Sequence, residues 1–152
     1  MRRAWRIVKA KHAATAFSGE GAAQAGGRWN SRNVAVVYAS DSKALAALET
    51  LVHLNPPVMF QYVVFQVGFE ASLIEDVPVR GLPADWRGEP PGAGTRGIGD
   101  AWAREARSAV LAVPSVIVSG ATNYVFNPAH RDFRRLVIDP PEPFAFDPRS
   151  LA

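Results

Sequence analysis

The chain has 152 residues, of which 48% are hydrophobic and 20% are charged, and this composition is ordinary for a globular protein. Its length predicts one domain spanning residues 1–152. The chain contains no cysteine, which excludes disulfides, thiolate catalysis and cysteine-ligated zinc. No apolar run approaches the ~20 residues of a membrane helix, and no signal-peptide core follows the N-terminus. These absences favour a cytoplasmic protein without a membrane partner.

The charge balance of the chain is only weakly basic. It has 17 lysines and arginines against 14 acidic residues, a formal net charge of +3. The basic residues are scattered, and only Arg131, Arg134 and Arg135 cluster, beside Asp132 and Asp139. A nucleic-acid-binding domain usually concentrates its basic residues on one face. The balance therefore fits a small anionic ligand better, and we expect no direct contact with nucleic acid.

Three strands are expected in the first half of the chain, because β-branched and aromatic residues follow one another there. They are 5–8, 34–39 and 59–69. A segment rich in alanine and glycine, 13–27, lies between the first two. A helix is expected over 43–54, since residues 40–42 offer N-cap oxygens before it and Pro56 stops it.

The expected helix 43–54 contains one carboxylate at an informative position. Leu45, Leu48 and Val52 recur at three- and four-residue spacing and predict an apolar stripe that faces the core. Glu49 lies at the edge of this stripe. A carboxylate that borders the core needs a hydrogen-bond partner or a chemical task, because burying it unpaired is costly.

The second half of the chain is predicted to contain short strands and one helix. The expected extended segments are 73–74, 77–79, 110–113, 116–118 and 135–138. Residues 88–99 are rich in glycine and proline and are expected to form a flexible loop, whereas 100–107 is expected to be helical. Strands outnumber helices, and most connections are too short for repeated βαβ crossovers. The predicted fold is a single α+β domain with antiparallel-rich β-sheets and flanking helices.

Common catalytic and metal-binding motifs are absent from the sequence. It has no Walker loop, no G-x-S-x-G turn and no H-E-x-x-H helix. His12, His53 and His130 lack metal-ligand spacing, so we expect no metal site, and we assign structural roles to His53 and His130. The glycines at 92, 94, 97 and 99 do not follow a strand in the dinucleotide-binding pattern, so we interpret them as loop residues only.

An ordered set of short motifs remains along the chain. They are Gly26-Gly27-Arg28-Trp29-Asn30, Val36-Val37-Tyr38-Ala39-Ser40, Ala47-Leu48-Glu49-Thr50-Leu51-Val52-His53-Leu54, Val113-Pro114-Ser115, Asn123-Tyr124, Asn127-Pro128-Ala129-His130 and Phe144-Ala145-Phe146-Asp147-Pro148-Arg149. Each piece alone is a weak signal, but their order and coverage are specific. The set resembles the RES domain, named for its Arg, Glu and Ser, which is the toxin half of bacterial RES–Xre toxin–antitoxin pairs.

The resemblance implies a compact fold similar to that of ADP-ribosyltransferase toxins. It implies that NAD⁺ binds as a substrate, with no resident cofactor, and that the bond between nicotinamide and ribose is cleaved. It implies catalytic roles for Arg28, Tyr38 and Glu49, and NAD⁺-binding roles for Arg28, Tyr38, Ser115 and Asn123. Ser119 is an alternative to Ser115, which we prefer because it completes Val-Pro-Ser. The implied protein partner is an Xre-type antitoxin.

These residue types suit the cleavage. When nicotinamide departs, the ribose acquires oxocarbenium-like positive charge, so the carboxylate of Glu49 can stabilise the transition state more than the substrate. Arg28 offers a planar fork of donors to the pyrophosphate or a ribose oxygen, and Tyr38 can stack on the nicotinamide ring. Ser115 can orient Glu49. Each residue also has a structural alternative that stays open. Arg28 can pair with Glu49, and Tyr38 can be a core aromatic. Glu49 can be a partly solvated helix residue, and Ser115 can be a turn residue or a cap.

Three functions are compatible with the sequence. The leading hypothesis is a toxin that degrades NAD⁺, with water or inorganic phosphate as the acceptor. The second is a protein mono-ADP-ribosyltransferase, because the acceptor is chosen by the surface around the site and not by the bond-breaking residues. The third is a non-catalytic module that binds nucleic acid or a partner protein, suggested by the isoelectric point of about 9.7.

Overall fold

Eight strands form one curled sheet in the computed structural model, which describes residues 1–53, 60–147 and 149. The strands are β1 (Arg2–Lys9), β2 (Val37–Ser40), β3 (Tyr62–Phe69), β4 (Ile74–Asp76), β5 (Val110–Pro114), β6 (Thr122–Phe126), β7 (Val137–Ile138) and β8 (Glu142–Phe144). The α-helices are α1 (Glu20–Ala25), α2 (Lys43–Leu51) and α3 (Ala93–Arg104), and the 3₁₀ turns are η1 (Ala10–Thr15), η2 (Ala71–Leu73), η3 (Val79–Gly81) and η4 (Arg131–Arg135). Within the described residues, no helix combines the length and apolar character required to cross a membrane.

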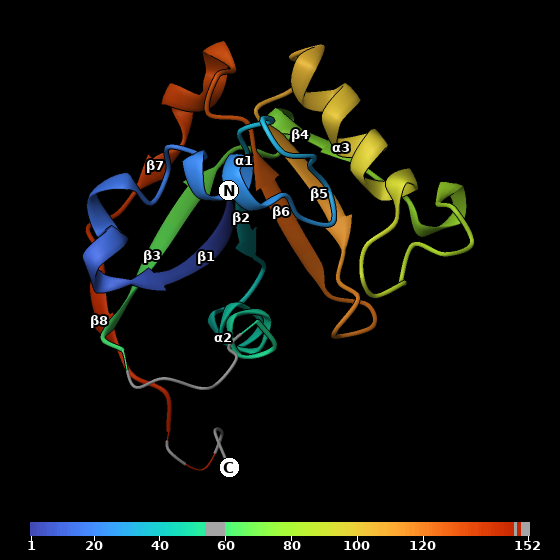
Figure 1. Cartoon of the computed structure of the whole chain (residues 1–152). Helices are drawn as coiled ribbons and strands as arrows, with labels where there is room; N and C mark the ends of the chain where they lie inside the picture. The colour runs from blue at the N-terminus through green and yellow to red at the C-terminus, as the bar shows by residue number, and fades with distance from the viewer. Residues whose placement is uncertain (54–59, 148, 150–152) are drawn as a thin grey trace.

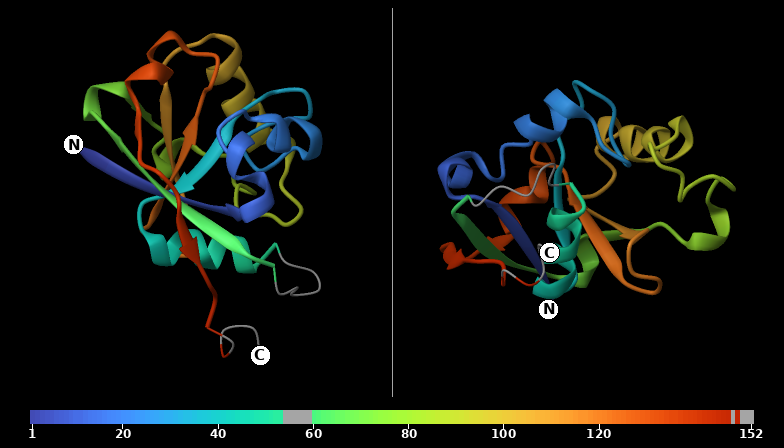
Figure 2. Two further views of the ribbon diagram at one scale, coloured as in Figure 1. Left: turned by 90° about the vertical axis from the view of Figure 1, so that its left-hand side faces the viewer. Right: turned by 60° about the horizontal axis from the view of Figure 1, so that its bottom comes forward.

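The sheet consists of two parts that meet at one residue pair. Its strand order is β4-β5-β6-β2-β1-β3-β7, and β8 also pairs with β3. Only β4 and β5 run parallel among the described pairs. β1 pairs with β3 along its whole length, but its register with β2 is the single pair Trp5↔Ser40. Figures 1 and 2 show the curl of the sheet. The predicted antiparallel-rich α+β fold is confirmed.

Two helices cover different regions of one sheet face. Ala46 of α2 packs in a cluster with Ile7 and Val64, whereas Trp102 of α3 packs in a cluster with Leu111 and other residues of β5 and β6. Figure 1 shows α2 beside the end of β2 and α3 along β5. Because side chains alternate along a strand, a third cluster that includes Phe69, Phe126 and Leu136 lies on the opposite face. The region between α2 and α3 on the first face holds the candidate site.

The predicted loop 88–99 is wrong in its second half. Residues 93–104 form α3, so three of the presumed loop glycines lie inside a helix. Gly99 is buried, and a Cβ atom at this position would collide with the carbonyl oxygen of Trp29. Glycine therefore allows the helix to approach the Gly-Gly-Arg-Trp-Asn segment closely, a tertiary requirement that resembles a loop signal in the sequence.

The predicted extended run 116–118 is also wrong. These residues lie in the turn that joins β5 to β6. Ser115 Oγ accepts hydrogen bonds from the backbone N–H groups of Ile117 and Val118, both at 3.1 Å, and this closes the turn. The strand that pairs antiparallel with β5 is β6, and it was missed because the β-branched run in the turn was taken as a strand.

Other predicted strands differ mainly at their ends. The predicted strands 5–8 and 110–113 lie inside β1 and β5, and 59–69 forms β3 from Tyr62 onward. Within the predicted strand 34–39, the observed strand β2 starts only at Val37. Of the predicted extended segment 73–74, the first residue belongs to η2 and the second begins β4. The predicted extended segment 77–79 contains no strand. The predicted strand 135–138 is shortened to β7, because η4 occupies Arg131–Arg135. The strand β8 was not predicted. The predicted helix 100–107 ends at Arg104. Residues 54 and 59 of the predicted elements lie outside the described residues.

The predicted core-facing stripe of the helix after residue 42 is wrong for two of its members. The helix ends at Leu51, and its buried residues are Leu45 and Ala46. Leu48 and Val52 are 43% and 57% exposed. Only the start of the helix therefore packs on the core, and Leu48 and Val52 face solvent.

Candidate active site

Glu49 is held by side chains from two strands. It lies in the last turn of α2, whose first turn is capped by Ser42 Oγ, which accepts from the N–H of Leu45 at 3.0 Å. Glu49 Oε1 accepts hydrogen bonds from Ser115 Oγ at 3.1 Å and from Asn123 Nδ2 at 3.0 Å. Ser115 directly follows β5 and Asn123 lies in β6, so three elements meet at one carboxylate. The structure thus brings together three of the residues that the family resemblance singles out.

The serine next to Glu49 is Ser115. It is 1% exposed, and its hydroxyl accepts from two backbone N–H groups of the turn while it donates to Glu49. A hydroxyl has one proton to donate and two lone pairs to accept, so these bonds fix its orientation. Ser119 lies later in the same turn and is exposed.

Ser40 is a member of this cluster that the sequence argument missed. It is 4% exposed, and its Oγ donates to Asn123 Oδ1 at 2.7 Å. The two residues face each other in the register of β2 and β6. The available signal was its place two residues after Tyr38, since residues i and i+2 of a strand share a face.

Tyr38 lies on the same strand face, but its hydroxyl is engaged elsewhere. The hydroxyl donates to Asn30 Oδ1 at 2.7 Å and accepts from the N–H of Trp29 at 3.1 Å. It lies so close to Gly27 that a Cβ atom there would be 2.8 Å from it. Burial raises the pKa of Tyr38 above its ordinary range, against the opposing effect of the Trp29 N–H. The phenol is therefore neutral, and it holds the Gly-Gly-Arg-Trp-Asn segment against β2.

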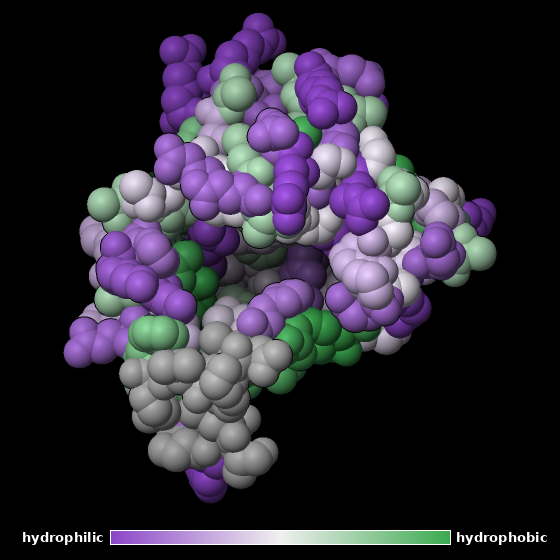
Figure 3. All heavy atoms as spheres, viewed as in Figure 1, coloured by the Kyte–Doolittle hydropathy of each residue, from purple (hydrophilic) through white to green (hydrophobic). Residues whose placement is uncertain are grey.

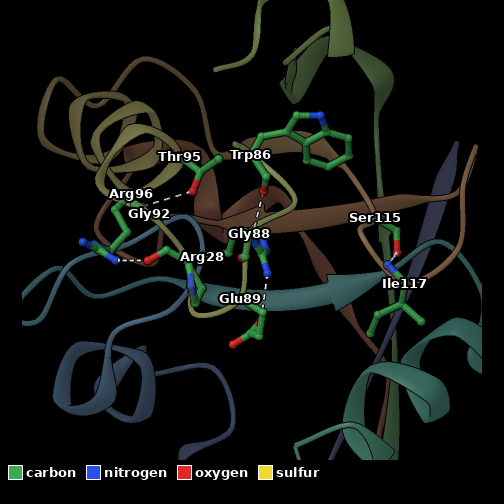
Figure 4. A network of polar contacts seen from close by, with 10 residues as sticks. Arg28, Trp86, Gly88, Glu89, Gly92, Thr95, Arg96, Ser115 and Ile117 are labelled. Carbon is green, nitrogen blue, oxygen red and sulfur yellow. Dashed lines mark hydrogen bonds and ion pairs between the residues drawn. The ribbon is translucent and has the colours of Figure 1, made fainter. Parts of the chain in front are cut away.

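Arg28 does not pair with Glu49. Its Nη1 donates to the carbonyl oxygens of Trp86 and Gly88, both at 2.8 Å, and its Nη2 lies 3.0 Å from Glu89 Oε2. Figure 4 shows the guanidinium among these three residues, with Ser115 set apart from it. The structural alternative of an Arg28–Glu49 pair is therefore wrong. Arg28 holds the 86–89 segment at the side of the site near α3.

Arg6 is a second arginine next to Tyr38, and the sequence argument did not single it out. Its Nε donates to the carbonyl oxygen of Ala16 at 2.8 Å and its Nη1 to that of Tyr38 at 2.9 Å. Among the described residues no carboxylate lies within 4 Å of its guanidinium. Burial lowers the pKa of Arg6 to about 10, so the group is still charged at neutral pH. It ties β1 to β2 beside the only register pair that joins them.

The remaining polar candidates have structural contacts away from Glu49. Asn127 is 3% exposed, and its Nδ2 donates to the carbonyl oxygen of Ala103. His130 Nδ1 accepts from the N–H of Asp132 and caps η4. His53 is exposed after the end of α2. Within the described part of the chain, no three metal-binding side chains cluster.

Glu49 itself is half-buried, and the face of the molecule that carries α2 is hollowed. Figure 3 shows this hollow in the face viewed, with hydrophobic side chains at its edge between α2 and the turn from β5 to β6. The exposed apolar residues on or directly after these two elements include Leu48, Val52, Ile117 and Val118. A separate cavity of about 310 Å³ is lined by Gly26, Gly27, Pro91 and Arg96, among others, but by no member of the Glu49 cluster.

Comparisons with known proteins agree along nearly the whole chain. The family model described as the RES domain matches residues 3–147. The chain is 41% identical to the "Prs ADP-ribosylating toxin" of Sphingobium sp. (strain YBL2), covering 97% of this chain and 95% of that protein. It is 37% identical to "Toxin Res" of Yersinia enterocolitica, covering 95% and 97%. The resemblance found in the ordered motifs is confirmed.

A solved structure has the same fold. A chain of the M. tuberculosis MbcT–MbcA toxin–antitoxin complex matches with a TM-score of 0.72 and 19% identity, covering 94% of this chain and 84% of that chain. At this identity the likeness establishes the fold alone. Because the family model covers residues 3–147 and the two relatives cover 95% or more of the chain, the chain belongs to the RES domain family.

Proposed function

We propose that this chain is a toxin that cleaves the bond between nicotinamide and ribose in NAD⁺. The observation that supports the proposal is the Glu49 carboxylate, whose Oε1 is held by Ser115 and Asn123. Among the described residues no group donates a hydrogen bond to Glu49 Oε2. Ser115 and Asn123 fix the orientation of the carboxylate through Oε1, while Oε2 can accept a hydrogen bond from a ligand. This arrangement suits a carboxylate that acts on a substrate.

The proposed reaction needs negative charge but no acid. The bond between ribose C1′ and the nicotinamide nitrogen breaks, and its electron pair stays with nicotinamide, which leaves as a neutral base. The ribose acquires oxocarbenium character, as in glycoside hydrolysis. Glu49 stabilises that positive charge directly, or accepts a hydrogen bond from a ribose hydroxyl that becomes more acidic in the transition state. Because the leaving group needs no proton, a paired carboxylate is not required.

We propose that Tyr38 and Arg28 bind NAD⁺ beside Glu49. Tyr38 lies two residues before Ser40, roughly 7 Å along the strand, and we assign its ring to stacking on nicotinamide. Arg28 is 15% exposed and its partner Glu89 is 73% exposed. An exposed ion pair contributes only about 0–1 kcal/mol. The pyrophosphate of NAD⁺ can therefore replace Glu89 on Nη2, while the two backbone carbonyls keep Nη1.

The acceptor of the ADP-ribosyl group has two candidates. Water or inorganic phosphate is the first, because Glu49 is only half-buried and small acceptors need no further binding surface. A protein side chain is the second, and one observation favours it. The Sphingobium relative, 41% identical to this chain, is named a Prs ADP-ribosylating toxin. The Prs protein of the same host is therefore the first protein acceptor to test.

We also propose an Xre-type antitoxin as the physiological partner. The fold shared with a chain of a toxin–antitoxin complex supports such a pair. Leu48, beside Glu49 in the sequence, is 43% exposed, and Ile117, bonded to Ser115 through its N–H, is 37% exposed. Exposed apolar side chains gathered at the mouth of a site are typical of a protein interface. An antitoxin placed on them would cover Glu49.

The test is a direct assay of NAD⁺ cleavage. Purified protein is incubated with NAD⁺ with and without inorganic phosphate, and nicotinamide, ADP-ribose and ADP-ribose-1″-phosphate are separated by chromatography. We expect nicotinamide release and a loss of roughly 10²-fold in Glu49→Gln, which keeps the shape but removes the charge. Glu70→Gln is the matched control, because Glu70 is exposed and lies on the turn after β3.

The acceptor follows from the second product. Free ADP-ribose identifies water, the phosphorylated form identifies phosphate, and label from adenine-labelled NAD⁺ on purified Prs or on lysate protein identifies a transferase. Folded protein that leaves NAD⁺ intact in every one of these arms contradicts the proposal. So does a Glu49→Gln variant as active as the wild type.

A further inference from the structure

A line of hydrogen bonds leads from a buried serine to the Glu49 carboxylate. Ser40 Oγ donates to Asn123 Oδ1 at 2.7 Å, and Asn123 Nδ2 donates to Glu49 Oε1 at 3.0 Å. Ser40 is 4% exposed, so water has little access to its side chain. It makes no hydrogen bond to Glu49 itself. Any effect of this serine on the carboxylate therefore passes through the Asn123 amide.

The direction of this line follows from the chemistry of its last member. An ionised carboxylate can only accept hydrogen bonds, so Asn123 must turn its NH₂ group toward Glu49. The amide oxygen then points the other way and needs a donor. Among the described residues Ser40 is the side chain that supplies one. Donors aligned in one direction also polarise one another, which strengthens the bond that reaches the carboxylate.

Ser40 is well placed to hold the amide because both parts of the sheet fix its backbone. It faces Asn123 in the register of β2 and β6, and it faces Trp5 in the single pair that joins β1 to β2. The next residue, Asp41, exchanges hydrogen bonds with Thr122, whose N–H donates to Asp41 Oδ2 at 2.9 Å. The distance between the serine and the amide is therefore set by the sheet and not by a flexible loop.

We propose that Ser40 is a positioning residue of the active site: it holds the Asn123 amide so that the NH₂ group fixes Glu49 Oε1 and leaves Oε2 to the substrate. The inference rests on the proposed function. Removing the hydroxyl leaves the amide oxygen of the half-buried Asn123 without its side-chain donor, which is unfavourable, so the amide can rotate away from Glu49. Ser115 also binds Oε1, but its removal opens the turn after β5 as well. Ser40 is the cleaner probe.

The experiment is a double-mutant cycle in the NAD⁺ assay. We expect Ser40→Ala to lower kcat for nicotinamide release about tenfold, the size of effect expected from one hydrogen bond, with KM for NAD⁺ changed less than about threefold. If Ser40 acts only through the Asn123 amide, adding Ser40→Ala to the Asn123→Ala variant should lower kcat by less than about twofold further. Ser40→Thr, which keeps a hydroxyl donor on a strand, should restore most of kcat.

Ser108→Ala is the matched control, because it also removes a partly buried serine hydroxyl with two hydrogen bonds, to Trp102 and Val110. It should lower stability and leave kcat unchanged. A tenfold loss from Ser40→Ala that persists in the Asn123→Ala background overturns the proposal. So does a Ser40→Ala variant with wild-type kcat.

A second measurement does not depend on activity. The side-chain NH₂ signals of Asn123 in a ¹H–¹⁵N spectrum are assigned by their loss in Asn123→Ala. We expect both signals to move in Ser40→Ala and to stay in place in Ser108→Ala. Unmoved signals overturn the inference even in an active enzyme. A wild-type protein without NAD⁺ cleavage contradicts the proposed function instead, and the spectrum still shows whether Ser40 holds the amide.

Discussion

Tyr38 illustrates how burial selects among the chemical properties of one side chain. Its hydroxyl is bonded on both sides, to Asn30 Oδ1 and to the N–H of Trp29, and burial raises its pKa beyond the ordinary range. Such a phenol stays protonated at neutral pH. The ring remains available for contact with a ligand, and the hydroxyl stabilises the segment that contains Arg28.

The raised pKa of Tyr38 predicts a pH dependence of stability. In the unfolded chain this tyrosine titrates near 10.0, whereas the folded protein keeps the proton to higher pH. Above pH 10 the unfolded state loses a proton that the folded state retains, so the free energy of unfolding falls as pH rises. The stabilisation is complete below pH 10 and is lost above it.

Tyr38→Phe removes this contribution. At pH 8 we expect the variant to be less stable by about 1–2 kcal/mol, because two hydrogen bonds are lost. The difference from wild type should shrink between pH 8 and pH 11 in urea unfolding experiments. Arg6, whose pKa is lowered to about 10 by burial, has the opposite effect in this range but is present in both proteins. A difference that is constant with pH contradicts the prediction.

At the scale of elements, α3 and the Gly-Gly-Arg-Trp-Asn segment are in direct backbone contact. Gly99 faces the carbonyl of Trp29 with no room for a Cβ atom, and Ser31 N–H donates to Asp100 Oδ1 of the same helix at 2.8 Å. The position of Arg28 therefore depends on how closely α3 approaches. A change in the helix can act on the site without touching a ligand.

We expect Gly99→Ala to destabilise the protein by at least 1–3 kcal/mol, since the added methyl group must displace the backbone of Trp29 or the helix. Gly97→Ala is the matched control in the same helix, where a Cβ atom meets nothing within 4 Å. Alanine has the higher helix propensity, so this variant should gain up to about 1 kcal/mol. Thermal and urea unfolding measure both. Equal effects of the two substitutions contradict the close approach.

At the scale of the whole molecule, the two parts of the sheet are joined narrowly. β1 and β2 share the single register pair Trp5↔Ser40, and Arg6 bridges from β1 to the carbonyl of Tyr38 beside it. The other Arg6 bond reaches the carbonyl of Ala16 after η1. The site residues of β2 and β6 thus lie where the two parts meet, which makes the junction part of the support of the site.

Arg6→Met tests the junction. Methionine retains much of the apolar bulk but donates no hydrogen bond, so the carbonyl oxygens of Ala16 and Tyr38 lose their side-chain donor. We expect the free energy of unfolding to fall by about 2–3 kcal/mol. Arg3→Met, at an exposed position of the same strand, should stay within about 0.5 kcal/mol of wild type. Urea unfolding measures the stability of both variants. Equal free energies of unfolding for Arg6→Met and Arg3→Met would show that the Arg6 hydrogen bonds do not stabilise the junction.

The sequence by itself determined the fold class, most of the strands and the family. Local β-branched runs, the Ser42 cap and the prolines act over a few residues, so their signals are complete in the sequence. The ordered motifs also named Glu49, Ser115 and Asn123, which the structure brings together. Errors occurred where one local signal has two causes: glycine marks a loop or a close approach, as at Gly99, and a β-branched run can fill a turn.

Only the tertiary structure decided which side chains are partners. Arg28 was free to pair with any carboxylate, and folding placed Glu89, sixty-one residues away, beside it. The place of Ser40 two residues after Tyr38 indicated only a shared strand face, because its role depends on the strand register that sets it against Asn123. Such contacts join residues far apart in the chain, so their distances depend on the packing of whole elements. The local pattern of residues contains no information about these distances.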